Sequence, residues 1–403
     1  MSAAGDFYVL GEGRYCQKAD QFSLDVDRLR RDRHELIGEV SVRVFSPEAP
    51  DGVVVSCADM NLSSQRARQE RAKFLTERAQ ANGYDFYGLI ETFCQRVIEA
   101  ERQGTPAIYL RDLPRPVADA ESAVEGFPIL RRHPMILFGD GGTCKSYLAL
   151  FFAGRLALEG WRILYADWEL SADDHRLRLE QLFGDDMPPV QYIRCDKPLV
   201  HEIDRIRRIC RSERIEYLVL DSVAVACAGP AEASEVCTEY FRALRSLGVG
   251  SLNLAHITKA EQGDLKPFGS SFWSNLARST WNIKLASGDG PVSTVGLYHR
   301  KFNLTGSHPA IGYEFDFSDG ETRVRQVSIA DTAGLAEALP LWQRMKLAVT
   351  HQPMTAAALA SELGPKANVE TIERYARKYT EVFTRVSGRD GITRIALVEK
   401  RAS

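Results

Sequence analysis

One segment constrains the fold of this chain more than any other, because an apolar stretch at 135–138 runs directly into a glycine-rich turn. The turn, residues 139–146, has the sequence GDGGTCKS, and apolar residues at helical spacing follow it. A strand, a turn of small residues and a helix in this order direct backbone N–H groups and the positive end of the helix at an anion such as a polyphosphate. The segment therefore predicts an α/β unit with a nucleotide site at this turn.

The turn follows the pattern G-x-x-x-x-G-K-[ST], in which two side chains have defined tasks. Lys145 is predicted to neutralise the β- and γ-phosphates of ATP, and Ser146 to place its hydroxyl on Mg²⁺. The predicted nucleotide-binding residues are Gly139, Asp140, Gly141, Gly142, Thr143, Cys144, Lys145, Ser146 and Tyr147. A glycine-rich turn that binds no nucleotide is the alternative, and the Lys-Ser pair at the start of the helix argues against it.

Cys144 departs from the pattern, because it stands where the final glycine is expected. If the backbone there has a positive φ, a side chain costs about 1 kcal/mol or more. In a helical conformation a cysteine would cost almost nothing. The sequence leaves both conformations open.

Two further apolar runs end in acidic residues. The run at 217–220 leads into Asp221, at the place where a nucleotide-binding sheet of this kind needs a carboxylate to hold Mg²⁺ through water. The run at 162–166 leads into Asp167 and Glu169, and Glu169 is the candidate that orients or deprotonates the attacking water. An ordinary turn residue at 221 and an exposed loop acid at 169 are the alternatives.

The pattern around these motifs predicts a mostly parallel sheet. Apolar runs at 135–138, 162–166, 217–220 and 251–255 alternate with helical patterns, which is typical of a doubly wound α/β sheet covered on both faces. Three later strands are expected at 294–299, 311–317 and 322–328, where an antiparallel arrangement is one option.

A length of 403 residues predicts two or three domains. Three prolines and several acids at 113–128 predict a linker. The predicted domains are an N-terminal α+β accessory domain at 1–115, an ATPase domain at 116–335 and a winged-helix domain at 336–403.

In the N-terminal region, β-branched runs at 40–45 and 52–57 predict a hairpin, and helices are expected at 61–80 and 86–103. The first of these helices carries a series of arginines. They form either a solvated helix face or a track for nucleic-acid phosphates.

The C-terminal region has the element order of a winged helix. Helices are expected at 341–350, 355–363 and 369–379, followed by strands at 382–387 and 393–398. Residues 340–403 hold 11 Lys plus Arg against 6 Asp plus Glu, a net charge of +5, so the rest of a chain of net charge −3 carries −8. This concentration of positive charge favours contact with DNA, and docking of a protein partner is the alternative.

Composition places the expected protein in the cytoplasm. Hydrophobic residues at 44% and charged residues at 26% are those of a globular protein, which argues against disorder. The eight cysteines form no C-x-x-C pair and no zinc-spaced cluster, so reduced thiols are expected. The sequence has no recognisable signal peptide and no run of 18 apolar residues, so no membrane partner is expected.

These motifs in their order resemble the RecA-like ATPases of the plasmid RepA replicative helicase type, over about residues 115–330. The resemblance rests on the glycine turn, Asp-Trp-Glu at 167–169, Leu-Asp-Ser at 220–222, LAHITK at 254–259 and FGSSFWSNLARSTW at 268–281. It implies a RecA-like core and a homo-oligomeric ring, a hexamer in this family, with ATP bound between subunits.

The resemblance also implies residue roles. Glu169 would be the catalytic acid, and His256 would sense the γ-phosphate. Arg278 and Lys301 would act on the ATP of the neighbouring subunit, where such cations stabilise the charge that develops on the phosphoryl oxygens. Lys259 and Lys266 would lie in a loop facing single-stranded DNA. A structural histidine at 256 and a surface ion pair at 278 are the alternatives.

Two functions follow from these patterns. The first is a DNA-dependent ATPase, a helicase or remodelling motor in replication or repair, with replication or repair proteins as further partners. The second is a regulatory or scaffold ATPase that uses nucleotide-dependent oligomerisation to recruit or load protein partners. Cys144 favours the second, because a weakened turn suits slow turnover.

Overall fold

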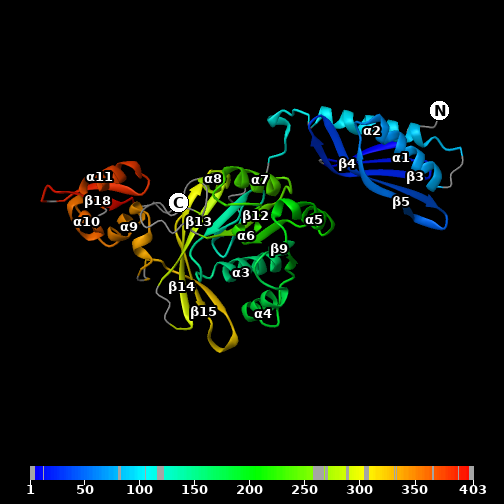
Figure 1. Ribbon diagram of the computed structural model, residues 1–403. Coiled ribbons are helices and arrows are strands. Elements are labelled where there is room, and N and C mark those ends of the chain that lie inside the picture. Colours follow the sequence, from blue (N-terminus) through cyan, green and yellow to red (C-terminus); the bar gives the residue numbers. More distant parts are fainter. Residues whose placement is uncertain are drawn as a thin grey trace. The chain divides into compact units, whose positions relative to one another are not determined.

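The structure, a computed structural model of the chain, divides into two compact units, Met1–Arg115 and Pro116–Ser403 (Figure 1). The residues that it describes are 5–11, 13–79, 83–104, 106–115, 122–256, 267, 271–286, 290–303, 308–330, 332, 334–364, 367–388 and 390–398. A further division of the second unit at residue 335 stays a prediction.

The first unit is a five-stranded antiparallel sheet with two helices. The strands, in spatial as well as chain order, are β1 (Asp6–Gly11), β2 (Arg14–Ala19), β3 (Phe22–Asp32), β4 (Glu35–Ser46) and β5 (Ala49–Asn61). Helices α1 (Gln65–Arg78) and α2 (Phe86–Gln103) follow, and the Ser64 and Asp85 side chains cap their first N–H groups. The core lies between one face of the sheet and the helices, and includes Val40 and Phe93. The predicted hairpin and both predicted helices are therefore present.

The second unit contains a mixed sheet of nine strands in the order β10-β9-β11-β12-β8-β13-β14-β15-β16. Its parallel strands are β8 (Pro134–Phe138), β9 (Ile163–Asp167), β10 (Gln191–Arg194), β11 (Tyr217–Asp221), β12 (Gly250–Ala255) and β13 (Ser279–Leu285). The antiparallel strands are β14 (Val292–Phe302), β15 (Ile311–Asp316) and β16 (Arg323–Val327). Two short strands, β6 (Ala123–Val124) and β7 (Phe127–Pro128), pair separately.

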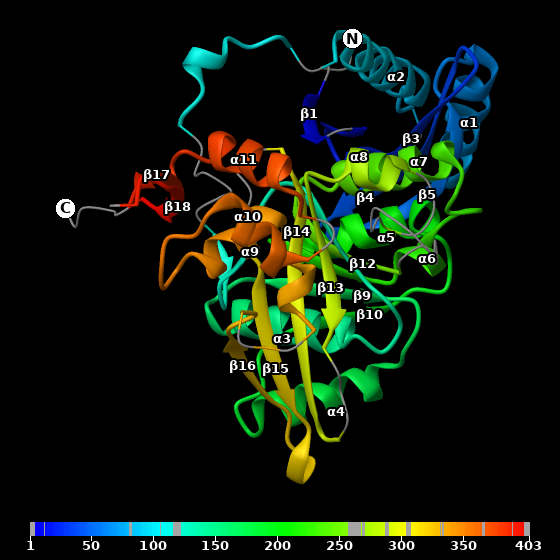
Figure 2. The ribbon, with the colours of Figure 1, turned by 90° about the vertical axis from the view of Figure 1, so that its left-hand side faces the viewer.

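Helices cover both faces of this sheet (Figures 1 and 2). On one face lie α3 (Lys145–Leu158) and α4 (Ala172–Phe183), and on the other α5 (Leu199–Ser212), α6 (Val223–Ala226), α7 (Ser234–Arg245) and α8 (Ser271–Leu276). All five residues of β8, β9 and β11 are buried, which explains their continuous apolar runs. This arrangement fits the expected α/β RecA-like core. The sequence did not predict β10 or β13.

The C-terminal part of the second unit has the predicted order of elements. Helices α9 (Leu341–Ala348), α10 (Ala356–Leu363) and α11 (Val369–Lys378) precede the antiparallel pair β17 (Phe383–Ser387) and β18 (Thr393–Leu397). These elements share a core that includes Leu359, Ile372 and Phe383. Classification as a winged helix stays a prediction.

Two general features bear on the expected environment. All eight cysteines carry free thiols, and six of them are buried. Among the described residues, no helix is long and apolar enough to cross a membrane. The cytoplasmic location stays a prediction.

Candidate nucleotide site

The turn between β8 and α3 has the geometry that a phosphate-binding loop needs. At Gly139 a Cβ atom would lie 2.5 Å from both the Cγ2 atom and the carbonyl oxygen of Ile283, so only glycine lets the end of β8 approach β13 this closely. Gly142 has a φ of +73°, and a Cβ at Gly141 or Gly142 would meet nothing within 4 Å. The turn thus presents an open stretch of backbone in front of the N-terminus of α3.

The Lys145 side chain curls back over this turn. Its Nζ atom donates hydrogen bonds to the carbonyl oxygens of Gly139, at 3.0 Å, and Asp140, at 2.6 Å, and lies 3.4 Å from Oγ1 of Thr143. Burial lowers the pKa of Lys145, and the nearby carboxylates of Asp221, Asp140 and Glu169 act in the opposite direction. The ammonium is therefore held inside the loop by acceptors that a phosphate can replace.

Two other predicted residues of the turn have internal partners. Thr143 donates its hydroxyl hydrogen bond to the carbonyl oxygen of Asp140 at 2.8 Å. Tyr147 is the third residue of α3, where its ring packs edge-on against Phe317 and its hydroxyl lies 3.3 Å from Oε1 of Gln181. Tyr147 is thus engaged in packing below the turn.

Cys144 adopts the strained alternative. Its φ of 59° and ψ of 19° place it in the left-handed region, at the N-cap of α3, where its side chain makes no capping hydrogen bond. This conformation costs a residue with a side chain on the order of 1 kcal/mol, which is the physical reason that glycine suits the position. Burial also raises the pKa of the Cys144 thiol, and the neighbouring Lys145 opposes that shift.

Asp221 lies at the carboxyl end of β11, at the same edge of the sheet as the turn. It is buried and accepts a hydrogen bond from the Tyr165 hydroxyl at 2.8 Å. Burial raises the pKa of Asp221, while hydrogen bonds from the Ser146 and Tyr165 side chains act to lower it. The two predicted magnesium residues, Ser146 and Asp221, are therefore neighbours.

This pair fits a magnesium ion that a nucleotide brings with it. Mg²⁺ is commonly bound by one or two carboxylates together with substrate phosphates, rather than by a complete protein cage. Among the described residues, no group of three or more His, Cys, Asp or Glu side chains could hold a metal ion. Ser146 and Asp221 would hold the ion on the protein side, with the phosphates completing its shell.

Glu169 lies on the loop after β9, and its carboxylate accepts a short hydrogen bond from the Ser222 hydroxyl. Ser222 follows Asp221 directly, so this contact ties the loop to the magnesium residue. The backbone N–H of Trp168 also donates to the Asp221 carbonyl oxygen at 2.7 Å. Both contacts hold Glu169 at the same edge of the sheet as Lys145.

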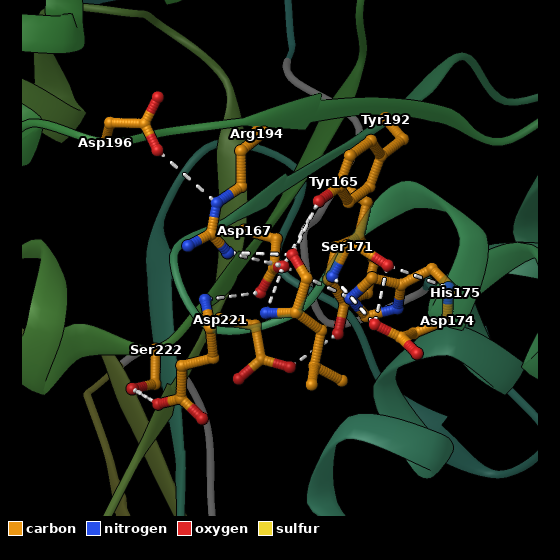
Figure 3. A network of polar contacts seen from close by, with 12 residues as sticks. Tyr165, Asp167, Ser171, Asp174, His175, Tyr192, Arg194, Asp196, Asp221 and Ser222 are labelled. Carbon is orange, nitrogen blue, oxygen red and sulfur yellow. Dashed lines mark hydrogen bonds and ion pairs between the residues drawn. The ribbon is translucent and has the colours of Figure 1, made fainter.

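The anchor of this loop is Asp167, a residue for which the sequence predicted no separate role. Its carboxylate is fully buried and accepts hydrogen bonds from the backbone N–H groups of Glu169, at 3.1 Å, and Leu170, at 2.7 Å. The Tyr192 hydroxyl donates to it at 3.2 Å, and Arg194 and His175 each have a nitrogen 3.5 Å from Oδ2 (Figure 3). These side chains come from β10 and α4, so Asp167 links β9 to both elements.

The ionisation of Asp167 follows from these partners. Burial raises its pKa, but His175 and the N–H groups of Glu169 and Leu170 more than compensate, so the pKa lies below its ordinary value. Asp167 therefore remains a carboxylate at neutral pH. Its place at the end of an apolar run, two residues before the predicted catalytic acid, was the only signal of it in the sequence.

His256 directly follows β12 and is exposed. The preceding carbonyl, of Ala255, accepts a hydrogen bond from the Gly139 N–H at 3.2 Å, so the end of β12 touches the start of the glycine turn. His256 is thus placed next to the turn. The two lysines expected in the following loop, Lys259 and Lys266, lie outside the described residues.

Lys301 is occupied by its own chain. Its Nζ atom donates to the carbonyl oxygens of Ser274, Asn275 and Ala277, at 2.7, 2.8 and 3.1 Å. Arg245 donates to the Leu276 carbonyl oxygen at 2.6 Å. Four consecutive carbonyls at the end of α8 are therefore covered by two cations, a complete C-terminal cap.

Arg278 follows this capped end and differs from Lys301 in its surroundings. Its side chain is exposed, and within the described parts of the chain no hydrogen bond or ion pair of its guanidinium is found. Burial is the main cause that lowers the pKa of Lys301 and of Arg245, and the positive charge of Arg278 lowers both pKa values further. The cap thus fixes the backbone from which Arg278 projects.

Arg278 lies at the opposite edge of the sheet from the glycine turn. Its backbone N–H donates to the carbonyl of Pro134, the first residue of β8, whereas the turn follows the last residue, Phe138. At about 3.3 Å per residue, the two ends of β8 are roughly 13 Å apart. The structure therefore brings together Lys145, Ser146, Asp221 and Glu169, and it places Arg278 and Lys301 elsewhere.

Comparisons with known proteins add little to this geometry. No protein-family model and no curated protein matches the chain. Among solved structures that match is a KaiC-like protein from the hyperthermophilic archaeon Pyrococcus horikoshii OT3, with 20% sequence identity and a TM-score of 0.41. The match covers 52% of this chain and 100% of that protein. A likeness of this strength carries no argument, so the interpretation rests on the site itself.

We expect Asp221→Asn to stabilise the free protein and to weaken Mg²⁺-dependent nucleotide binding. Burial raises the pKa of Asp221, so ionisation above that pKa opposes folding, whereas a neutral amide still accepts from Tyr165. The gain in melting temperature should be largest at pH 7 and shrink as the pH falls through the raised pKa. Asp196→Asn, at an exposed carboxylate, is the control. An equal gain or loss at pH 7 and at pH 3.8, the ordinary pKa of this carboxyl group, would contradict the burial argument.

We expect two substitutions of Cys144, to glycine and to valine, to show how much the strained backbone conformation at this position matters. Cys144→Gly relieves the left-handed conformation and should keep or improve nucleotide affinity. Cys144→Val places a β-branched residue there and should cost roughly 1 to 2 kcal/mol. Thermal unfolding and nucleotide titration measure both effects. Equal behaviour of the two variants would show that backbone conformation does not matter at this position.

Proposed function

We propose that this chain is a Mg²⁺-dependent ATPase of the RecA-like kind that acts on DNA, as a helicase or a DNA-remodelling motor in replication or repair. The observation that carries the ATPase activity is the convergence of Lys145, Ser146, Asp221 and Glu169 at one edge of the sheet. Burial lowers the pKa of Lys145, and both acids are close enough to oppose that shift, while Ser146 hydrogen-bonds to Asp221. A cation, a hydroxyl and two carboxylates around an open turn suit hydrolysis of a polyphosphate.

Each residue has a task in this mechanism. The backbone of Gly141 and Gly142 and the ammonium of Lys145 bind the phosphates. Bound Mg²⁺ supplies further positive charge for the phosphate oxygens. Glu169 orients the attacking water and accepts its proton, and the Ser222 hydroxyl holds that carboxylate in place. In this proposal His256, which is next to the turn, senses the γ-phosphate.

The position of Arg278 supports a site shared between copies of the chain. An exposed guanidinium at the far edge of the sheet cannot reach the nucleotide of its own turn, but in a ring it can face the turn of a neighbour. In this proposal Arg278 stabilises the charge that develops on the phosphoryl oxygens. Lys301 then acts as a positioning residue, because its ammonium fixes the end of α8. A hexamer is the ring that the sequence resemblance implies.

DNA contact is proposed through the C-terminal part of the second unit. Arg374 and Lys378 are exposed on α11 and lie over the rings of Tyr375 and Tyr379, at 5.9 and 5.4 Å from the ring centres. Cations interleaved with aromatic rings suit the phosphates and bases of single-stranded DNA.

A regulatory or scaffold ATPase is the second candidate, and two observations favour it. The strained Cys144 weakens the turn, which suits slow turnover. In the C-terminal hairpin, Arg385 pairs with Glu373 and Arg394 with Asp390, so part of the positive charge there is neutralised internally. In that case ATP would change the mass of the oligomer while turnover stays negligible.

The experiment that separates the two functions is an ATPase assay with and without single-stranded and duplex DNA, together with mass measurement with and without ATP. Stimulation by DNA, with binding that weakens as salt rises, supports the motor. An ATPase rate unaffected by DNA, together with no salt-sensitive DNA binding, would rule it out.

We expect Glu169→Gln to bind ATP normally and to lose turnover by about 10²-fold or more, because the amide cannot accept the proton of the attacking water. Glu159→Gln, at an exposed position at the end of α3, is the matched control. Binding is followed by titration and turnover by phosphate release. Turnover like that of the unmodified protein would remove Glu169 from this role.

We expect Arg278→Ala to keep nucleotide binding and to lose turnover by about 10² to 10³-fold. Lys145→Ala should lose binding, yet a mixture of the two variants should recover activity well above either alone. In the mixture, a Lys145→Ala copy supplies Arg278 to the intact turn of an Arg278→Ala copy. Arg208→Ala, exposed on α5, is the control. A mixture no more active than its components would count against a shared site.

A further inference from the structure

The sheet of the first unit has two open edges. Within the described residues, β1 pairs only with β2, and β5 pairs only with β4. The outer side of each edge strand therefore carries backbone N–H and C=O groups that are available to another strand. Neither edge is protected by a run of charges: Val9 in β1 is 65% exposed and Val53 in β5 is 57% exposed. Tyr8 and Leu10 beside Val9 are exposed as well.

A groove of about 620 Å³ accompanies the β5 edge. Residues 55–61 of β5 form one wall, and one face of α1 forms the other, with Phe74 47% exposed in it. The seven consecutive β5 residues along the groove are enough to pair with the six residues of β1. The groove is thus long enough for one added strand of the size of β1.

The charges of the groove favour an acidic strand. Its two acids are already paired, Asp59 with Arg30 at 2.7 Å and Glu70 with Arg66 at 2.8 Å. Its two arginines, Arg71 and Arg78, have no ion pair with an acid among the described residues. Arg71 donates a short hydrogen bond to the Ser56 hydroxyl of β5 and longer ones, at 3.4 Å, to two β5 carbonyl oxygens, so its positive charge faces no carboxylate. β1 carries an acid, Asp6, and no basic residue.

The side-chain alternation of β1 also matches the groove. Val9 lies opposite Tyr15, which belongs to the core under the helices, so Val9 is on the helix-covered face of the sheet. If the sheet continues into a second copy, that face of β1 meets the face from which α1 presents Phe74. Two exposed apolar side chains, Val9 and Phe74, then come together.

We propose that β1 of one copy adds to β5 of the next copy, in the groove beside α1, so that the N-terminal units of this chain join head to tail. Because β1 and β5 run in the same direction, the new ladder is parallel. Each copy contributes one β1 and one β5, so the contact is heterologous and closes into a ring when the rotation between copies allows it. This contact is independent of the nucleotide site and of the ATPase function proposed for it.

The test uses two charge insertions in the full chain, Val9→Lys on β1 and Phe74→Lys on α1. The mass of each protein is measured by light scattering without nucleotide over a range of concentrations. The unmodified chain should self-associate, and each variant alone should associate at least tenfold more weakly. Val225→Lys, at an exposed apolar residue of the second unit, should leave association unchanged.

An equal mixture of the two variants gives the decisive result. The Val9→Lys copy keeps its groove and the Phe74→Lys copy keeps its β1, so the mixture should form dimers and no larger species. Circular dichroism and thermal unfolding check that both variants fold, and unchanged ATP binding separates this contact from the nucleotide site. A monomeric unmodified chain, a mixture that stays monomeric, or a loss of association in only one of the two variants would overturn the proposal.

Discussion

The buried carboxylate of Asp167 determines where the reactive groups of this protein lie. This carboxylate accepts hydrogen bonds from the backbone N–H groups of Glu169 and Leu170. The backbone carbonyl of Asp167 accepts a further hydrogen bond, from the N–H of Cys195, at 2.8 Å. A charge in the interior is costly unless donors surround it, and here the donors come from the loop after β9 and from β10, with His175 of α4 3.5 Å from the carboxylate. The interactions that keep Asp167 ionised are therefore the same ones that fix the loop carrying Glu169.

The direction of the parallel strands extends this constraint to the whole site. The ends of β8, β9, β11 and β12 meet at one edge, which brings the turn, Glu169, Asp221 and His256 together. β13 runs parallel to β8, so the residue before it, Arg278, lies at the other edge. One sheet therefore presents the glycine turn at one edge and a cation at the other. Because these two surfaces lie at opposite edges, the turn of one copy can meet the Arg278 of a different copy but not its own.

The strands that the sequence predicted best are those that are buried on both faces of the sheet. Strands β8, β9, β11 and β12 are buried on both faces, and their unbroken apolar runs identified them. β10 is only partly buried, and β3 alternates apolar with polar residues, so no unbroken apolar run marks either strand. Spacing alone indicated Lys145, Ser146 and Asp221, because their roles follow from one turn and one strand end.

Other features depended on contacts between distant segments. The role of Asp167 requires β10 and α4, and the role of Lys301 requires the carbonyls of α8, 24 to 27 residues away in sequence. The conformation of Cys144 was open in the sequence, because an L-residue adopts a positive φ only where the surrounding turn enforces it. A sequence motif identifies the residues that are expected to contact a ligand. The residues that hold them in position are determined by tertiary packing, which a motif does not contain.

The two proposed contacts between copies place the same demand on symmetry. Arg278 facing a neighbour's turn and β1 adding to a neighbour's β5 are both heterologous, and both repeat from copy to copy in one rotational sense. Once either contact forms, the partners of the other are held at a high effective concentration, so two weak contacts can give one stable ring. The edge-strand contact needs no nucleotide, whereas the Arg278 contact gains strength only as charge develops on a bound phosphate. The first unit would therefore keep the copies together between rounds of hydrolysis, while the contacts of Arg278 form and break.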